Sequence, residues 1–268
     1  MHPHTTPEQC KFLKEFDHDV HAEWQRRVDL ISELKGAEMA NLMRQRFYAT
    51  YYNDPYMALK PGRIYLLGLN PGGPDDYKYD QPEEPPFDWG DKFNETGKPY
   101  SSFLDEEWSA SPGNAPYQRN VTRLVMHLHG RSREDDPDAM SMRTTFATNV
   151  CFLRTPNAEE LWKYPPELID WHEFHERLVA IVQPEIILCI GNQMNQSSSF
   201  SILHHQQQSP RYEEYKVNDR RNVRAFVADK LLPDKQIKVI GVPHLSQPFA
   251  SMDDVCAATD KAISEMNA

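Results

Sequence analysis

The sequence predicts an α/β protein with three layers, in which a central parallel sheet of about four strands lies between helices. Short apolar runs of strand length alternate with helical patterns along most of the chain. These runs contain few polar residues, as expected for strands that are buried on both faces. The 268 residues suffice for one large domain whose apolar core needs no disulfide or metal for stability.

Two helices are expected before the first strand. Residues 7–35 carry apolar side chains at helical spacing, with a proline near the start and a glycine after the end. A second helix is expected over 38–52. We therefore interpret residues 1–60 as a helical extension packed on a core of about 60–268, within a single domain.

The core alternates strands with helices, which predicts a parallel sheet covered on both faces. Four apolar runs are interpreted as strands, at 63–69 (RIYLLGL), 145–153 (TFATNVCFL), 185–190 (EIILCI) and 236–242 (QIKVIGV). Helices are expected over 117–129, 166–182, 219–231 and 250–266. Residues 71–114, rich in proline, glycine and aromatic residues, are expected to form a long ordered loop or lid, and 192–218 a partly loop-like segment.

The net charge of −11 argues against a protein that coats nucleic acid without sequence preference, because phosphate attraction needs lysine and arginine. Local basic patches remain available, at Arg119, Arg123, Arg131, Arg133, Arg143, Arg211, Lys216, Arg220, Arg221 and Arg224. Four scattered cysteines without a CxxC pair indicate a reducing compartment and no metal or iron–sulfur site. His172 and His175 share a helix face without a nearby acid or cysteine, and we interpret both as solvated surface.

No signal peptide is recognised, and the apolar runs are far shorter than the ~20 residues that a membrane span requires. We expect a cytoplasmic protein, or a nuclear one in a eukaryote, that has no cofactor, no metal and no membrane partner. We also expect a monomer.

Polar residues and glycines follow the predicted strands, where ligands bind in open α/β sheets. They are Gly68, Asn70, Gly72 and Gly73, then Asn149, then Gly191, Asn192 and Gln193, and finally His244, Ser246 and Gln247. An amide can read the edge of a heterocycle, because it offers both a donor and an acceptor. A histidine can donate to a developing anion, and a glycine turn lets backbone N–H groups approach a ligand. This set fits recognition of a base and stabilisation of a leaving anion, and it fits acyl transfer poorly.

Three segments, GLNPG at 68–72, TNVC at 148–151 and PHLSQ at 243–247, together resemble the uracil-DNA glycosylase superfamily. The nearest branches are the single-strand-selective and mismatch-specific ones, whose first motif resembles G-x-N-P-G. The resemblance covers about 60–260 and implies a parallel sheet of about four strands between helices.

The resemblance implies that Asn70 positions the attacking water, that Asn149 reads the pyrimidine edge and that His244 donates to the base O2. Gly68 and Gly72 would then lie beside the base. Three aromatic residues are candidates to stack on the base, in the order Tyr77, Tyr79 and Phe87. DNA contacts are expected from Ser246, Gln247, Phe249 (as a wedge), Arg220 and Arg221.

The sequence departs from the family pattern at two points. The histidine motif is His244-Leu245-Ser246, where the family carries His-Pro-Ser. Asn70 stands where the most active branch carries aspartate, so water activation would depend on orientation and not on a base. The long loop after Asn70 leaves the substrate open among uracil, an oxidised uracil and a bulkier modified pyrimidine of the kind found in phage DNA.

The resulting hypothesis is a monofunctional DNA glycosylase that flips its target nucleotide and leaves an abasic site, in DNA repair or in defence against foreign DNA. One alternative is a non-catalytic sensor of DNA or bases that keeps the pocket. A more distant alternative is an α/β enzyme whose 70–74 turn cradles a phosphate, although neither GxxxxGK[ST] nor GxGxxG is present. Taken singly, each of the three residues also has a purely structural interpretation. Asn70 would belong to a turn between a strand and a helix, Asn149 would contact a neighbouring loop, and His244 would be a rim histidine without a function.

Overall fold

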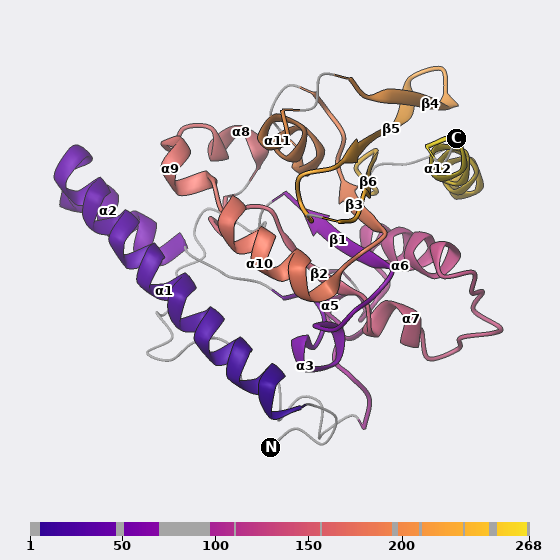
Figure 1. Cartoon of the computed structure of the whole chain (residues 1–268), viewed down its shortest axis with the longest axis horizontal. Helices are drawn as coiled ribbons and strands as arrows, with labels where there is room; N and C mark the ends of the chain where they lie inside the picture. The colour runs from indigo at the N-terminus through magenta and orange to yellow at the C-terminus, as the bar shows by residue number, and fades with distance from the viewer. Residues whose placement is uncertain are drawn as a thin grey trace.

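The centre of the molecule is a six-stranded sheet (Figure 1). The computed structural model describes residues 6–46, 51–69, 97–109, 111–155, 157–194, 198–208, 211–232, 234–246 and 251–266. The strands are β1 (Ile64–Gly68), β2 (Phe146–Asn149), β3 (Ile186–Ile190), β4 (Glu213–Asn218), β5 (Arg221–Ala228) and β6 (Ile237–Val242). They lie in the order β2-β1-β3-β6-β5-β4.

The four predicted strands form the parallel part of this sheet. β2 pairs with β1, β1 with β3, and β3 with β6, each in parallel. Almost every residue of these strands is buried, which explains why the sequence shows them as continuous apolar runs.

The sheet is larger and more mixed than predicted, because β5 and β4 are added in antiparallel orientation beyond β6. The helix predicted over 219–231 was therefore wrong. In β5, Val223 and Ala225 face one layer of the core while Phe226 and Ala228 face the other. The backbone N–H and C=O groups of β6 would have no strand partner on this side without β5, so the long-range pairing determines the conformation of this segment. The polar segment 192–218 also contains a helix, α11 (Ser199–Gln206), and β4.

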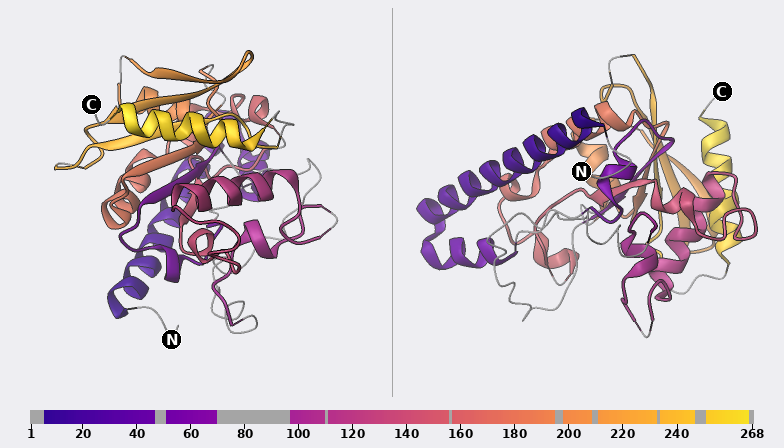
Figure 2. Two further views of the ribbon diagram at one scale, coloured as in Figure 1. Left: turned by 90° about the vertical axis from the view of Figure 1, so that its right-hand side faces the viewer. Right: turned by 90° about the horizontal axis from the view of Figure 1, so that it is seen from below.

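Helices cover both faces of the sheet, as predicted (Figures 1 and 2). One face packs against α5 (Ser102–Asp105), α6 (Pro116–Leu128), α7 (Met140–Arg143) and α12 (Met252–Glu265). The other face packs against α10 (His172–Val182), α11 and the N-terminal helix, with the short helices α3 (Pro55–Ala58), α8 (Ala158–Leu161) and α9 (Pro166–Ile169) at its margins. The single helix predicted over 166–182 is divided into α9 and α10. At the break, the Asp170 carboxylate accepts the backbone N–H of His172 at 3.0 Å.

The N-terminal helix α1 (Pro7–Lys35) has the predicted bounds. Thr6 and Gln9 form a capping box at its start, and Gly36 ends it with a φ of 91°. Its apolar stripe packs on α10, where the rings of Phe16 and Phe174 meet edge to face at 5.7 Å. Both α1 and the following helix lie on the side of the sheet opposite α12 (Figure 2).

The second helix, α2 (Ala37–Arg46), is shorter than the predicted range of 38–52. Tyr51 instead forms an antiparallel bridge with Thr148 of β2, and Asn53 forms one with Ser101. Residues 51–53 therefore extend the sheet beyond β2. None of the described helices is both long and apolar enough to cross a bilayer.

Candidate functional site

The carboxyl ends of the parallel strands lie at one edge of the sheet. From β1 the chain continues to β2 on one side and then to β3 on the other side, so the direction of winding changes at β1. Such a switch point is the usual ligand site of an open α/β sheet. Gly68 ends β1, Asn149 ends β2, and His244 follows β6 by two residues. Several other predicted residues of the rim, the base stack and the DNA contacts lie outside the described residues, namely Asn70, Gly72, Gly73, Tyr77, Tyr79, Phe87, Gln247 and Phe249.

Gly68 and Asn149 are directly paired across β1 and β2. A Cβ atom at Gly68 would lie 2.3 Å from Oδ1 of Asn149, well inside van der Waals contact. Only glycine therefore lets the Asn149 side chain lie over the end of β1. The structure brings these two predicted residues together.

The Asn149 amide is 1% exposed and only partly hydrogen-bonded. Its Oδ1 accepts a hydrogen bond from the Tyr52 hydroxyl at 3.0 Å. Its Nδ2 is buried and has no acceptor among the described residues. A buried polar group without a partner is destabilising by about 1–3 kcal/mol, so this N–H is available to an acceptor that a ligand brings.

Tyr52 was missed by the sequence analysis, which placed it at the end of a helix. Its N–H donates to the Ala147 carbonyl at 2.9 Å, and its own carbonyl accepts the N–H of Ser102 at 2.6 Å. Its ring packs against Phe103, with centroids 5.2 Å apart, and against Trp108 at 6.1 Å. Both its backbone and its ring are therefore fixed next to Asn149.

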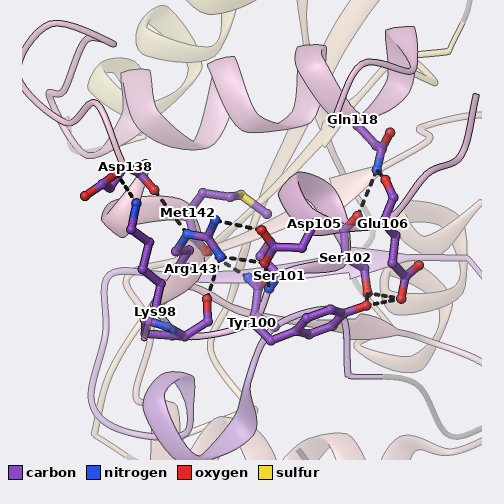
Figure 3. Close-up of polar contacts among 12 residues, drawn as sticks. Lys98, Tyr100, Ser101, Ser102, Asp105, Glu106, Gln118, Asp138, Met142 and Arg143 are labelled. Carbon is purple, nitrogen blue, oxygen red and sulfur yellow. Dashed lines mark hydrogen bonds and ion pairs between the residues drawn. The ribbon is translucent and has the colours of Figure 1, made fainter. Parts of the chain in front are cut away.

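The segment that holds Tyr52 in place is anchored by a buried arginine (Figure 3). Arg143 binds both carboxylate oxygens of Asp105, at 2.6 and 2.8 Å, and donates to the Pro99 carbonyl at 2.6 Å. Such a planar fork is stronger and more specific than a single charged contact. Arg143 was predicted as part of a basic surface patch, but it is 8% exposed and serves this internal anchor.

A second part of the same polar network fixes Trp108. The Glu106 carboxylate accepts hydrogen bonds from the Trp108 indole at 2.8 Å, from Ser102 Oγ at 3.1 Å and from the Tyr100 hydroxyl. Gln118 of α6 donates to the carbonyls of Ser102 and Glu106, both at 2.8 Å (Figure 3). The indole therefore has a fixed orientation although the residue is 37% exposed.

His244 follows β6 and packs against the first turn of α6. Its ring is stacked on that of Tyr117, with centroids 5.2 Å apart and an interplanar angle of 21°. Its Nδ1 lies 2.8 Å from Ser246 Oγ and 3.4 Å from the Ser246 backbone nitrogen. Because a backbone N–H can only donate, Nδ1 is the acceptor and the ring proton is on Nε2. Although the His244 residue is exposed, desolvation by the atoms packed around its ring lowers the pKa of the imidazole, which favours the neutral form.

The His244 loop is held against α6. Asn120 donates to the carbonyl of Leu245 at 2.9 Å. Tyr117 is the second residue of α6, so His244 borders the positive end of a 13-residue helix. This end favours negative charge on a ligand and disfavours a protonated histidine.

A continuous series of ring contacts connects the two predicted polar residues. We call Tyr52, Phe103, Trp108, Tyr117 and His244 the aromatic wall. Within it Tyr117 is stacked between His244 and Trp108, the latter at 5.9 Å and 23°, and Trp108 contacts Tyr52. The hydroxyl of Tyr52 then contacts Asn149. Asn149 thus contacts one end of the aromatic wall, and His244 forms the other end.

The described residues that were predicted to contact DNA, Ser246, Arg220 and Arg221, lie at two places on this edge of the sheet. Ser246 is exposed and interacts with His244. Arg220 and Arg221 lie at the turn between β4 and β5, and Arg220 is exposed. Because β5 runs antiparallel to β6, this turn lies at the same edge of the sheet as His244.

The predicted rim residue Asn192 has a structural role. Its Nδ2 donates to the carbonyls of Asn222, at 2.5 Å, and Gly241, at 3.1 Å. It therefore joins β5 to β6 and has no N–H left for a ligand in this direction.

His175 was predicted as solvated surface, but it is 2% exposed. Its Nε2 donates to the Val150 carbonyl at 3.0 Å, and its Nδ1 accepts from the Tyr65 hydroxyl at 2.8 Å. Burial lowers the pKa of this imidazole to about 4. A neutral histidine thus holds the residue that follows Asn149.

The described residues contain no group of three histidine, cysteine, aspartate or glutamate side chains placed to hold a metal ion. Compared with protein-family models and with curated proteins, the chain matches no family and no protein. Its function must therefore be inferred from the residues at the sheet edge.

Proposed function

We propose that the chain is a monofunctional DNA glycosylase that hydrolyses the N-glycosidic bond of a flipped pyrimidine nucleotide. The observation that carries the proposal is that the aromatic wall joins two polar groups: the buried Nδ2 of Asn149, which has no acceptor among the described residues, and the imidazole of His244. The resemblance of three sequence segments to uracil-DNA glycosylases supports the same function.

Base recognition is assigned to Asn149. A base that is flipped out of the stack exposes its hydrogen-bonding edge, at a cost of a few kcal/mol if it was paired. The buried Nδ2 of Asn149 supplies a donor to that edge. Aromatic stacking on the base adds roughly 1–3 kcal/mol.

Stabilisation of the leaving group is assigned to His244. When the bond between C1′ and N1 breaks, its electron pair leaves with the base, and negative charge develops on the ring and on O2. Neutral His244 donates from Nε2 to this anion, and the positive end of α6 favours the same charge. Removing one such donor typically lowers the rate by about 10²–10³.

The sequence resemblance assigns the attacking water to Asn70. The water oxygen forms the new bond to C1′ as the bond to N1 breaks; the water proton passes to solvent, and the released base anion takes up a proton from solvent. Because an amide cannot accept that proton as a base would, the reaction depends on departure of the base anion. Arg220 and Arg221, at the same edge, are assigned to phosphate contacts.

The experiment is a base-excision assay with labelled oligonucleotides, single-stranded and duplex, each carrying one candidate base. The bases are uracil, 5-hydroxymethyluracil, 5-hydroxymethylcytosine and its glucosylated form. Alkali then cleaves the DNA at abasic sites. Strand cleavage that requires the base, and whose rate Asn70→Ala and His244→Ala each lower by a factor of about 100 or more, is the expected result.

Asn41→Ala is the matched control, because Asn41 is an exposed asparagine on α2, far from this sheet edge. It should leave cleavage unchanged. Absence of cleavage on every base, with base-dependent binding retained, would instead identify a sensor that keeps the pocket. The net charge of −11 and the asparagine at position 70 are the observations that favour that second function.

A further inference from the structure

We infer that Trp108 binds a second nucleobase of the DNA, a neighbour of the target base that stays outside the buried site. This inference rests on the proposed function and adds a contact with its substrate. Trp108 belongs to none of the three segments that resemble the glycosylases.

The indole of Trp108 is exposed and yet held in one orientation. The residue is 37% exposed. Its Nε1 donates to the Glu106 carboxylate at 2.8 Å, and that carboxylate also accepts hydrogen bonds from the hydroxyls of Ser102 and Tyr100 (Figure 3). A side chain that is already ordered loses little conformational freedom when a ligand binds. The indole is therefore a preorganised surface.

Other rings of the aromatic wall support the indole. Its centroid lies 5.5 Å from that of Phe103, which is 2% exposed, 5.9 Å from that of Tyr117 and 6.1 Å from that of Tyr52. The part of the indole that these rings leave uncovered is an aromatic surface open to a ligand. Every nucleobase has a π-face that stacks on such a surface, whatever its sequence context.

Trp108 lies outside the buried site that is assigned to the target base. Asn149, which is assigned to the edge of that base, is 1% exposed, and the ring of Tyr52 lies between its amide and Trp108. Tyr117 is the only described ring that contacts both Trp108 and His244. A whole ring thus separates the exposed indole from each polar group. The base that stacks on Trp108 is therefore a neighbour of the target base.

The charges beside Trp108 favour a base over a phosphate as its ligand. Glu106 and the exposed Glu107 directly precede it in the chain, and carboxylates repel phosphate. The net charge of −11 also limits the affinity that phosphate contacts can supply. Stacking needs no positive charge, so a base on Trp108 adds affinity that this acidic chain does not obtain from the DNA backbone.

The test measures binding of single-stranded oligonucleotides from which one neighbouring base has been removed. Each strand carries the candidate base that wild type binds most tightly, as its 2′-fluoro nucleotide, whose glycosidic bond resists hydrolysis. A tetrahydrofuran residue replaces one nucleotide at the first or second position on either side of the target. The backbone and its charge stay the same, so the ratio of the two Kd values reports the missing base alone.

For wild type, removal of the base at one of these positions should weaken binding about tenfold, as expected for the loss of one stacked base. Trp108→Ala should weaken binding of the intact strand about tenfold and leave the strand without that base unchanged, which brings the ratio close to one. Trp108→Phe keeps a smaller ring and should retain part of the ratio.

Trp162→Ala is the matched control, because Trp162 is a partly buried tryptophan that packs on the opposite face of the sheet. It should leave the ratio unchanged. A purely structural role of Trp108 would weaken binding of intact and base-free strands by the same factor. An unchanged ratio in Trp108→Ala would therefore overturn the inference.

The outcomes for wild type separate this inference from the proposed function. A ratio of about tenfold that depends on Trp108, without excision of any candidate base, would support the inference and refute the glycosylase. Excision with a ratio of one at every position would overturn the inference and leave the glycosylase. Absence of both binding and excision would overturn both.

Discussion

Replacement of Gly68 by alanine tests the geometry at the centre of the candidate site. The added Cβ atom would lie 2.3 Å from Oδ1 of Asn149, whereas such contacts remain above 3.0 Å in real structures. The strand backbone at Gly68 is held by its pairing with β2, where its carbonyl accepts the N–H of Val150 at 2.9 Å, so the Asn149 amide has to move. We expect a displacement of about 1 Å, which can lower a catalytic rate about 100-fold.

The stability effect should be smaller than the effect on the rate. Overpacking of a buried site is destabilising by about 1–3 kcal/mol. For a chain of this size each kcal/mol corresponds to roughly 2–4 °C in Tm. Gly68→Ala should therefore fold, with a Tm lower by several degrees, and should lose excision activity about 100-fold at a temperature well below its Tm.

The control is Gly62→Ala, where an added Cβ would meet only the Lys60 carbonyl at 3.6 Å, an ordinary contact distance. The assay measures single-turnover excision of uracil from an oligonucleotide, together with a thermal melt. In a double-mutant cycle, Gly68→Ala should have no further effect once Asn149→Ala has removed the amide. Full activity of Gly68→Ala, or an equal loss in the Asn149→Ala background, would refute the reasoning.

Three further predictions concern buried charged or titratable groups. His175 has a pKa of about 4 in the folded protein and about 6.5 when unfolded, so the unfolded state binds more protons between these values. The free energy of unfolding should therefore fall by about 3 kcal/mol as the pH drops from 6.5 to 4, and urea titrations of His175→Gln should lack this component. Burial raises the pKa of Asp17 to about 7, so the folded state binds the extra proton and stability decreases as the pH rises from about 4 to 7. Asp17→Asn should remove this decrease and have a higher Tm than wild type at pH 8, and an equal or lower Tm would contradict the assignment. Arg143→Lys keeps the charge but loses the two-point contact with Asp105, and should lower the free energy of unfolding by about 2 kcal/mol in urea titrations; no change would mean that the fork is dispensable.

The parallel strands and the edge that carries the candidate site could be predicted from the sequence because their signals are local. A strand buried on both faces reads as a short apolar run, whatever it pairs with. Once the strands are placed, Gly68, Asn149 and His244 fall at their carboxyl ends without knowledge of the strand order. The pairing of Gly68 with Asn149 then follows from the observed register.

The features that were missed depend on partners far away in the chain. The apolar residues of β5 fit a helical and an extended pattern almost equally, and the pairing with β6 decides between them. Tyr52 continues the pattern of α2, but its conformation is set by β2, about a hundred residues later. His175 gives no local sign of burial, because its partner Tyr65 lies 110 positions earlier.

The bridge between Tyr51 and Thr148 has a consequence for how copies of this protein behave in solution. Among the strands that the structure describes, β2 is the last on its side of the sheet, and an uncovered edge strand is a template for pairing with another molecule. Residues 51–53 occupy that template, and Ser101 continues the cover. The segment that contacts the Asn149 amide therefore also shields the sheet from self-association, so changes that detach it should increase aggregation together with the loss of ligand binding.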